Sequence, residues 1–209
     1  MPGVDAVVLL PVKAFGEAKA RLAGVLDPAQ RARLARWTAE RVVAAAGELP
    51  VYVACDDDEV AEWATAHGAT VLWHPGAGLN GAVNASLASL RADGVTQVVV
   101  AHGDLPYPAG LPGIARPGVV TLVPDRHGDG TNVASIPTVS GFQLAYGPGS
   151  FRRHLDAAVA AGLAVEVRRD PLLGLDIDTA ADLRHPLVVE VLPPWVPTSP
   201  ASQPSPITR

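Results

Sequence analysis

The chain has 209 residues, of which 48% are hydrophobic and 18% are charged, and its formal net charge is −5. A chain of this length can bury about 70% of the surface that its unfolded form exposes, so it needs neither disulfides nor metals in order to fold. Its single cysteine, Cys55, excludes a scaffold held together by internal disulfides. We therefore expect one globular domain with a substantial core.

The same composition limits location and partners. The sequence contains no run of about 18 apolar residues, the length that a membrane span needs. Residues 1–5 lack the basic region that opens a signal peptide, so we expect a cytoplasmic protein that binds no membrane. A mildly acidic chain is also poorly suited to nucleic acid, because non-specific binding requires clustered cations. Any polyanionic ligand must be held by a local group of cations or by a metal.

The first half of the chain alternates short apolar runs with helical patterns. Apolar runs predict strands over 6–10, 51–54, 70–73 and 97–101. Helices are predicted over 27–47, about 57–67 and about 80–92, and Asp27 before Pro28 marks the start of the first one. The buried face of that first helix is predicted to carry Leu34, Trp37, Thr38 and Val42. This alternation predicts an α/β fold of Rossmann-like type, with a mostly parallel central sheet and helices on both faces.

The second half is less regular. Strands are predicted over 119–123, 132–136, 141–145 and 164–167, a helix over about 150–161, and another helix near 180–183. We interpret this half as an insertion or antiparallel extension of the same sheet. From residue 192 onward, prolines lie among serines and threonines without hydrophobic periodicity. We therefore predict a single domain over 1–191 and a disordered Pro/Ser-rich tail over 192–209.

Three cations follow the first predicted strand within nine residues: Lys13, Lys19 and Arg21. In an otherwise acidic chain, such a loop would suit a di- or triphosphate. The alternative is a solvated basic turn. Neither a Walker A loop nor a Gly-x-Gly-x-x-Gly motif is present, so the two commonest phosphate-binding loops are absent.

Carboxylates follow in two places where ligands are expected. Asp104 comes just after the apolar strand 97–101, at the edge of the sheet where α/β proteins bind ligands. Asp176 and Asp178 point to the same side if their segment is extended. Close like charges are unfavourable unless a cation neutralises them, and Mg²⁺ is commonly held by one or two carboxylates together with substrate phosphates. The alternative is that Asp104, and Asp178 or Thr179, cap helices.

Three glycine-rich segments complete the polar set. Residues 124–132 and 146–154 are rich in turns, and Ser150 opens a predicted helix whose free N–H groups would suit an anion. Ordinary turns with Ser150 as an N-cap are the alternative. In 75–81, Asn80 would suit the edge of a nucleobase or would simply cap a helix. Cys55 is expected to be inert packing.

Together these segments indicate a metal-dependent enzyme that places a nucleoside triphosphate next to a small anionic acceptor. Phosphoryl-type transfer depends mostly on positioning and charge neutralisation, so no protein nucleophile is required.

The motifs also resemble those of a known family. Pro11-Val12-Lys13 with residues 18–23, His102-Gly103-Asp104-Leu105-Pro106, and Asp125-Arg126 with Gly130-Thr131-Asn132 carry the resemblance. Gly147-Pro148-Gly149-Ser150-Phe151 with His154, and Leu175-Asp176-Ile177-Asp178-Thr179, complete it. In this order, over about residues 6–185, the chain resembles the phosphoenolpyruvate/2-phospho-L-lactate guanylyltransferases, which act in the biosynthesis of coenzyme F(420).

The resemblance implies a fold of the nucleotide-diphospho-sugar transferase type. It implies transfer of GMP from GTP to a phosphorylated three-carbon acid, with release of pyrophosphate. Among possible acceptors, phosphoenolpyruvate is favoured over 2-phospho-L-lactate and 3-phosphoglycerate, only by association with the Ala- and Arg-rich composition of the chain. It also implies that the partners are small molecules, with a downstream transferase of the same pathway as a further candidate.

By motif position, the resemblance also implies roles for individual residues. Asp104, Asp176 and Asp178 would hold Mg²⁺. Thr131, Asn132, Gly147 and Ser150 would bind the phosphorylated acid. Lys13, Lys19 and Arg21 would act on the triphosphate as nucleotide-binding and catalytic residues, and Gly78, Leu79 and Asn80 would lie near guanine.

Two features depart from the family pattern. The segment between Leu105 and Val119 is short, so a helix expected there would be shrunken, and the Pro-rich tail lies outside the family core.

Two other functions remain open. One is a different Mg²⁺-dependent nucleotidyltransferase with a sugar-phosphate or molybdopterin acceptor, although the usual glycine-rich loop after the first strand is missing. The other is a non-catalytic α/β binding module.

Overall fold

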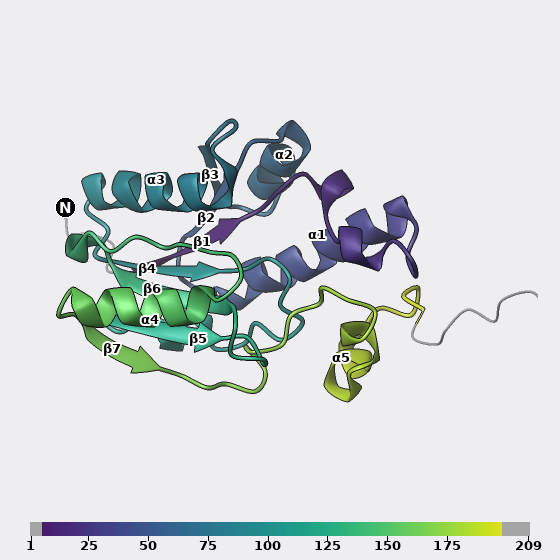
Figure 1. Ribbon diagram of the computed structural model, residues 1–209. Helices are drawn as coiled ribbons and strands as arrows, with labels where there is room; N and C mark the ends of the chain where they lie inside the picture. Colours follow the sequence, from purple (N-terminus) through teal and green to yellow (C-terminus); the bar gives the residue numbers. More distant parts are fainter. Residues whose placement is uncertain (1–5, 198–209) are drawn as a thin grey trace, which may run out of the picture.

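A seven-stranded sheet in the order β3-β2-β1-β4-β6-β5-β7 forms the centre of the protein (Figure 1). The computed structural model describes residues 6–197. Neighbouring strands are parallel except where β6 pairs antiparallel with β4 and with β5. The strands are β1 (Ala6–Pro11), β2 (Val51–Cys55), β3 (Thr70–Trp73), β4 (Gln97–Ala101), β5 (Val119–Pro124), β6 (Thr131–Pro137) and β7 (Ala164–Val167).

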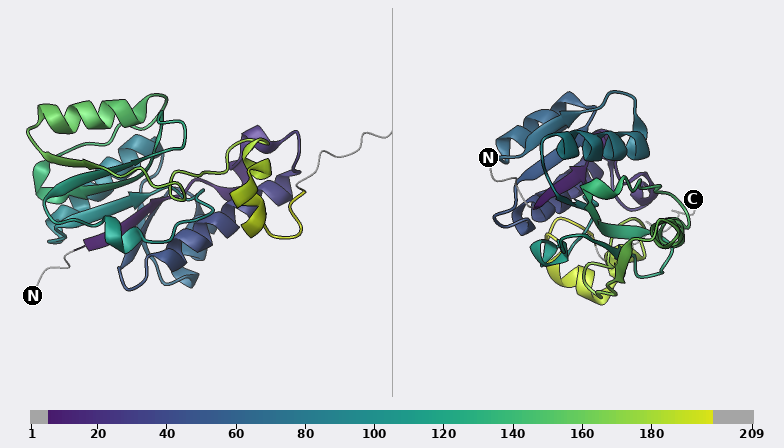
Figure 2. Two further views of the ribbon diagram at one scale, coloured as in Figure 1. Left: turned by 90° about the horizontal axis from the view of Figure 1, so that it is seen from below. Right: turned by 90° about the vertical axis from the view of Figure 1, so that its left-hand side faces the viewer.

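Helices cover both faces of this sheet, as predicted. Core side chains of α1 (Pro28–Ala45) and α2 (Asp58–Ala66) pack on one face. Those of α3 (Gly78–Ala92) and α4 (Ser150–Ala160) pack on the other. Figure 2 shows α4 and α1 on opposite sides of the strands. The predicted α/β fold class is therefore confirmed.

Local chemistry fixes the start of α1 where the sequence predicts it. The Asp27 carboxylate accepts a hydrogen bond from the Gln30 N–H at 2.8 Å, and the Gln30 side chain accepts one from the Asp27 N–H at 2.9 Å. Leu34, Thr38 and Val42 are buried as predicted. Trp37 is only half-buried and packs at the edge of a separate cluster near the C-terminus.

The second half of the chain extends the first sheet. All five residues of β4 are buried, and β6 pairs with it along its whole length. Because β6 runs antiparallel, its first residue, Thr131, lies beside the end of β4 at the edge where β1 and β2 also end. The predicted antiparallel extension is confirmed, and it brings the glycine-rich segment 124–132 to the edge of the sheet where α/β proteins commonly bind ligands.

The strand predicted over 141–145 is wrong. The Asn84 amide on α3 donates to the Leu144 carbonyl and accepts from the Leu144 N–H, both at 2.9 Å. Asn80 makes the same pair of contacts with Tyr146, at 3.2 and 2.7 Å. Two side-chain amides therefore take the backbone groups that a neighbouring strand would use. The shortened segment between β4 and β5 keeps a single 3₁₀ turn, Leu111–Ile114.

A third hydrophobic cluster joins the turns after β1 to the C-terminal segment. Leu22 and Leu26 pack with Ile177 and with Val188 of α5 (Pro186–Val191), a helix that the sequence analysis did not predict. Figure 2 shows α5 beside these turns. The helix expected near 180–183 is a 3₁₀ turn, Asp182–Arg184.

Predicted disorder from residue 192 is wrong for residues 192–197. Val196 is buried in the same cluster, and the Arg33 guanidinium stacks on the Trp195 ring at 4.3 Å. The remainder of the predicted tail, 198–209, lies outside the described residues. Within 6–197, no helix has the length and apolar character to cross a membrane.

Candidate active site

Three carboxylates from distant parts of the chain meet beyond the end of β4. One oxygen from each of Asp104, Asp176 and Asp178 lies within 4.8 Å of the other two. The Ile177 N–H donates to the Asp104 carbonyl at 3.1 Å, which aligns the Asp-x-Asp segment with the strand end. Since Asp176 and Asp178 flank Ile177, both reach the same side, as an extended segment requires. The structure thus brings the predicted metal-ligand set together.

Lys19 is the cation in closest contact with this set. Its ammonium lies 3.2 Å from Asp104 Oδ2 and 3.5 Å from Asp178 Oδ1, and its side chain is only 7% exposed. Arg21 approaches Asp178 at 3.9 Å with a largely exposed side chain. Two of the three predicted cations therefore contact the carboxylates directly.

The electrostatics of the set show too much negative charge for the cations present. Burial, and then the neighbouring Asp104 and Asp178, raise the pKa of Asp176 to about 7. Burial alone would raise the pKa of Asp104 as well, but Lys19 and His102 hold it below its usual value. Asp104 therefore stays ionised at neutral pH, whereas Asp176, with its raised pKa, is only partly ionised there.

The donor set fits a hard divalent cation. Carboxylate oxygens are the protein ligands that Mg²⁺ prefers. Asp104 Oδ1 is buried and has no hydrogen-bond partner among the described residues, so this oxygen is free to bind a cation. The residues present therefore fit a Mg²⁺ ion.

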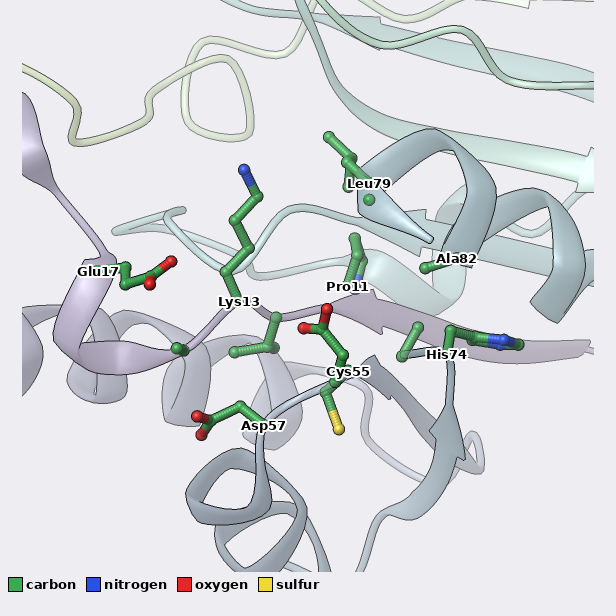
Figure 3. Close-up of a pocket in the computed structure, with 13 residues that line it drawn as sticks. Pro11, Lys13, Glu17, Cys55, Asp57, His74, Leu79 and Ala82 are labelled. Atoms are coloured by element: carbon green, nitrogen blue, oxygen red, sulfur yellow. The ribbon is translucent and has the colours of Figure 1, made fainter. Parts of the chain in front are cut away.

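Two cavities open on either side of the segment that follows β1. One, of about 360 Å³, reaches Lys19, Asp104 and Asp178. The other, of about 390 Å³, extends over the ends of β1 and β2 (Figure 3). Both are lined by Pro11–Lys13 and Leu79, and Figure 3 shows the Lys13 side chain standing between Glu17 and Leu79. The two cavities thus share a wall that carries Lys13.

The residues predicted near guanine divide into two groups. Gly78 and Leu79 line the larger cavity. Asn80 is not among its lining residues within 6–197, because its amide is engaged by the backbone of Tyr146. The structure thus gives the Asn80 amide a structural contact, the anchoring of the 144–146 loop to α3, while its base-reading role stays a prediction.

The predicted acceptor residues lie around the start of β6 and of α4. The Asn132 carbonyl accepts from the His102 N–H at 3.0 Å, which places this group next to the strand end before Asp104. Ser150 is buried at the first position of α4, and its N–H donates to the Gly147 carbonyl at 3.0 Å. Asn132 donates to the Leu173 carbonyl at 3.0 Å, so its amide also ties β6 to the segment before Asp176.

His154 connects Thr131 to the loop before α4. Its Nε2 accepts from the Ala145 N–H at 2.8 Å, so a neutral ring carries its proton on Nδ1 and donates to Thr131 Oγ1 at 3.0 Å. Burial, and then the nearby Arg153, lower the pKa of His154 to about 4. At neutral pH this imidazole is therefore an uncharged brace between the two glycine-rich segments.

Asp182 is the residue of the site that the sequence analysis gave no role. It is buried, it accepts from the N–H groups of Asp178 and Thr179, and it pairs with Arg126. The capping role suggested for Asp178 or Thr179 is reversed, because Asp182 accepts and these two residues donate. The sequence does contain a signal for this contact, an aspartate four residues after Asp178, but the segment between them is too short to be recognised as a turn.

The fold and the edge site define the class of this protein. A putative nucleotide-diphospho-sugar transferase from Desulfovibrio desulfuricans matches with a TM-score of 0.71 at 19% identity, over 86% of this chain and 84% of that chain. A nucleotidyl transferase from Methanothermobacter thermautotroptrophicus matches with a TM-score of 0.60 at 19% identity, over 87% and 94%. The protein is an enzyme with a nucleotidyltransferase fold.

The sequence places it more narrowly. The family model described as "Guanylyl transferase CofC like" matches residues 6–189. A phosphoenolpyruvate guanylyltransferase from Conexibacter woesei is 39% identical over 84% of each chain, and one from Streptomyces coelicolor is 34% identical over 89% of this chain and 92% of its own length. The chain belongs to the CofC-like guanylyl transferase family, which confirms the resemblance drawn from the motifs.

Proposed function

We propose that the protein transfers GMP from GTP to a phosphorylated three-carbon acid, phosphoenolpyruvate in first place and 2-phospho-L-lactate in second, in the biosynthesis of coenzyme F(420). The observation that carries this proposal is the meeting of three carboxylates and two cations at the edge of the sheet where β4 ends. The names of the relatives support the acceptor class.

In this reaction an oxygen of the acceptor phosphate attacks the α-phosphorus of GTP. A new P–O bond forms there, and the bond from the α-phosphorus to the oxygen that bridges to the β-phosphate breaks, so that pyrophosphate leaves with the electron pair. The acceptor phosphate is largely ionised at pH 7, so it needs no general base. The main barrier is the meeting of two anions, which at about 4 Å repel by several kcal/mol at an intermediate dielectric.

In this proposal, separate groups of residues bind the triphosphate, the acceptor and Mg²⁺. Lys13, on the wall between the two cavities, would contact the triphosphate, and Lys19 and Arg21 would offset charge beside the reacting phosphates. Thr131, Asn132, Gly147 and Ser150 would bind the acceptor beside the first turn of helix α4. Asp104, Asp176 and Asp178 would hold Mg²⁺, which as a Lewis acid lowers the repulsion between the two substrates.

A pyrophosphate-release assay tests the proposal. Purified protein is incubated with GTP and Mg²⁺ and with phosphoenolpyruvate, 2-phospho-L-lactate or 3-phosphoglycerate in turn, with ATP and CTP as control nucleotides. We expect release with GTP that depends on the acid, fastest with phosphoenolpyruvate, and a product with the mass of the guanosine diphospho-acid. Release that is independent of any acid, or faster with ATP or CTP, would contradict the proposal.

A further inference from the structure

The turn that carries Asp178 is held in place by a single buried carboxylate. Asp182 Oδ2 accepts three hydrogen bonds, from the Asp178 N–H at 2.9 Å, the Thr179 N–H at 2.6 Å and the Thr179 hydroxyl at 3.0 Å. Its side chain is 5% exposed. A buried carboxylate with this many donors is well satisfied and fixes the backbone around it.

The second oxygen of this carboxylate is held from another part of the sheet. Asp182 Oδ1 pairs with the Arg126 guanidinium, 56 residues away in the chain. Arg126 follows β5, and its own N–H donates to the Gly174 carbonyl at 2.8 Å. Arg126 therefore holds the segment that bears Asp176 and Asp178 at two points, once through its backbone and once through Asp182.

These contacts bear directly on the candidate metal ligands. Asp178 projects from the turn that Asp182 closes, and its carboxylate approaches the cations Lys19 and Arg21 at 3.5 and 3.9 Å. Asp104, Asp176 and Asp178 repel one another, so without a brace the Asp178 turn would relax away from the other two. An ion would then have to bring it back at a cost in binding free energy.

We propose that Asp182, held by Arg126, is a positioning residue that fixes Asp178 as a metal ligand. Asp182 touches neither substrate nor ion in this role and acts only through the backbone of Asp178 and Thr179. The inference rests on the metal site of the proposed function. It makes the Arg126–Asp182 pair a link between the end of β5 and the metal centre.

The chain offers a matched control for this pair. Asp170 Oδ1 accepts from the Leu172 and Leu173 N–H groups at 3.0 and 3.1 Å, and the other oxygen pairs with Arg168 at 3.1 Å. This is the same kind of aspartate–arginine brace on a turn that carries none of the three carboxylates. Removing it should destabilise the protein without changing metal affinity.

The test measures metal binding directly. Mn²⁺ is titrated into the full-length wild type, Asp182→Ala and Asp170→Ala, and free Mn²⁺ is followed by electron paramagnetic resonance, while thermal unfolding is recorded in parallel. We expect Asp182→Ala to weaken Mn²⁺ binding about tenfold or more, a loss typical when a residue supporting a metal ligand is removed. Asp170→Ala should bind Mn²⁺ like the wild type.

Milder variants keep the test decisive if Asp182→Ala does not fold. Asp182→Asn keeps one acceptor oxygen for the turn but loses the pairing with Arg126, so we expect a smaller loss of affinity than for alanine and none for Asp170→Asn. Equal Mn²⁺ affinities in the Asp182 and Asp170 variants, or no Mn²⁺ binding by the wild type, would overturn the inference. A wild type that binds Mn²⁺ but releases no pyrophosphate would contradict the proposed function alone.

Discussion

Lys19 and Asp104 form an ion pair of 3.2 Å although 85 residues separate them in the chain. Lys19 takes a left-handed backbone conformation there, with φ of 57°, and no other non-glycine residue among 6–197 has a positive φ. Such a conformation is unfavourable for a residue with a side chain and is commonly retained at functional sites. The backbone at Lys19 is therefore strained, and this conformation places the Lys19 ammonium beside the carboxylates.

Lys19 variants separate this strain from the charge. Lys19→Gly and Lys19→Ala both lose the ammonium, so both should lose most pyrophosphate release with GTP and phosphoenolpyruvate. Glycine adopts positive φ without steric cost, so the glycine variant should be more stable than the alanine variant by about 1 kcal/mol in urea unfolding. Equal stability of the two variants, or activity retained in either, would contradict this account.

Asp104→Asn tests the carboxylate set. The substitution keeps the shape of the side chain but removes one of the charges proposed to hold Mg²⁺, so activity should fall by about a hundredfold or more, as for other preorganised electrostatic contacts. The fold should persist, because the Asp104 carbonyl and not its side chain docks Ile177. Circular dichroism and pyrophosphate release provide the two measurements.

Asp58→Asn is the matched control for that variant. Asp58 is an exposed carboxylate in the first turn of α2 and is not one of the three clustered acids. Its loss should leave activity within about twofold of the wild type, the range expected for a surface substitution of up to about 0.5 kcal/mol. An Asp104→Asn protein as active as Asp58→Asn would rule out the metal role of Asp104.

The lowered pKa of His154 predicts how the stability of the protein depends on pH. Burial, then Arg153, lower its pKa to about 4 in the folded protein, whereas the unfolded chain has a value near 6.5. Between these values the unfolded state binds more protons, so the stability due to this group is complete above pH 6.5 and is lost as the pH falls toward 4. We expect the stability advantage of the wild type over His154→Gln to shrink by about 1–3 kcal/mol across this range.

Urea unfolding of both proteins at half-unit steps from pH 7 to pH 4 measures that difference. A constant difference across the range would show that His154 does not carry the effect. A difference that grows toward pH 4 would show the opposite sign and contradict the neutral brace between Thr131 and the loop before α4.

Asn80 and Asn84 form a pair for testing the loop over α3. Each amide makes two hydrogen bonds to one residue of the 144–146 segment. Alanine at either position leaves a backbone N–H and a carbonyl without their partners, so each variant should lose about 1–3 kcal/mol of stability. The KM for GTP should change equally in the two, since neither amide lines the larger cavity. A larger rise in KM for Asn80→Ala alone would support the base-reading role predicted for Asn80.

The sequence by itself determined most of the elements and the class of chemistry. Apolar runs, the Asp27 cap and the glycines after helices are local features. Within residues 6–197 they placed all seven strands and four of the five α-helices near their observed bounds, and they added one strand, over 141–145, that is not there. The order of the motifs was enough to identify the family, and three of them directly follow the ends of β1, β4 and β5.

Only the tertiary structure decided how distant groups pair. The amides of Asn80 and Asn84 displaced a predicted strand, Lys19 reached Asp104 across the sheet edge, and Asp182 reversed the expected caps. The packing of Val196 likewise ordered residues whose composition is typical of a disordered tail. The Asn80, Asn84 and Lys19 contacts join residues 60 or more positions apart, so no local propensity records them. They form only when packing of the sheet has already brought their backbones together.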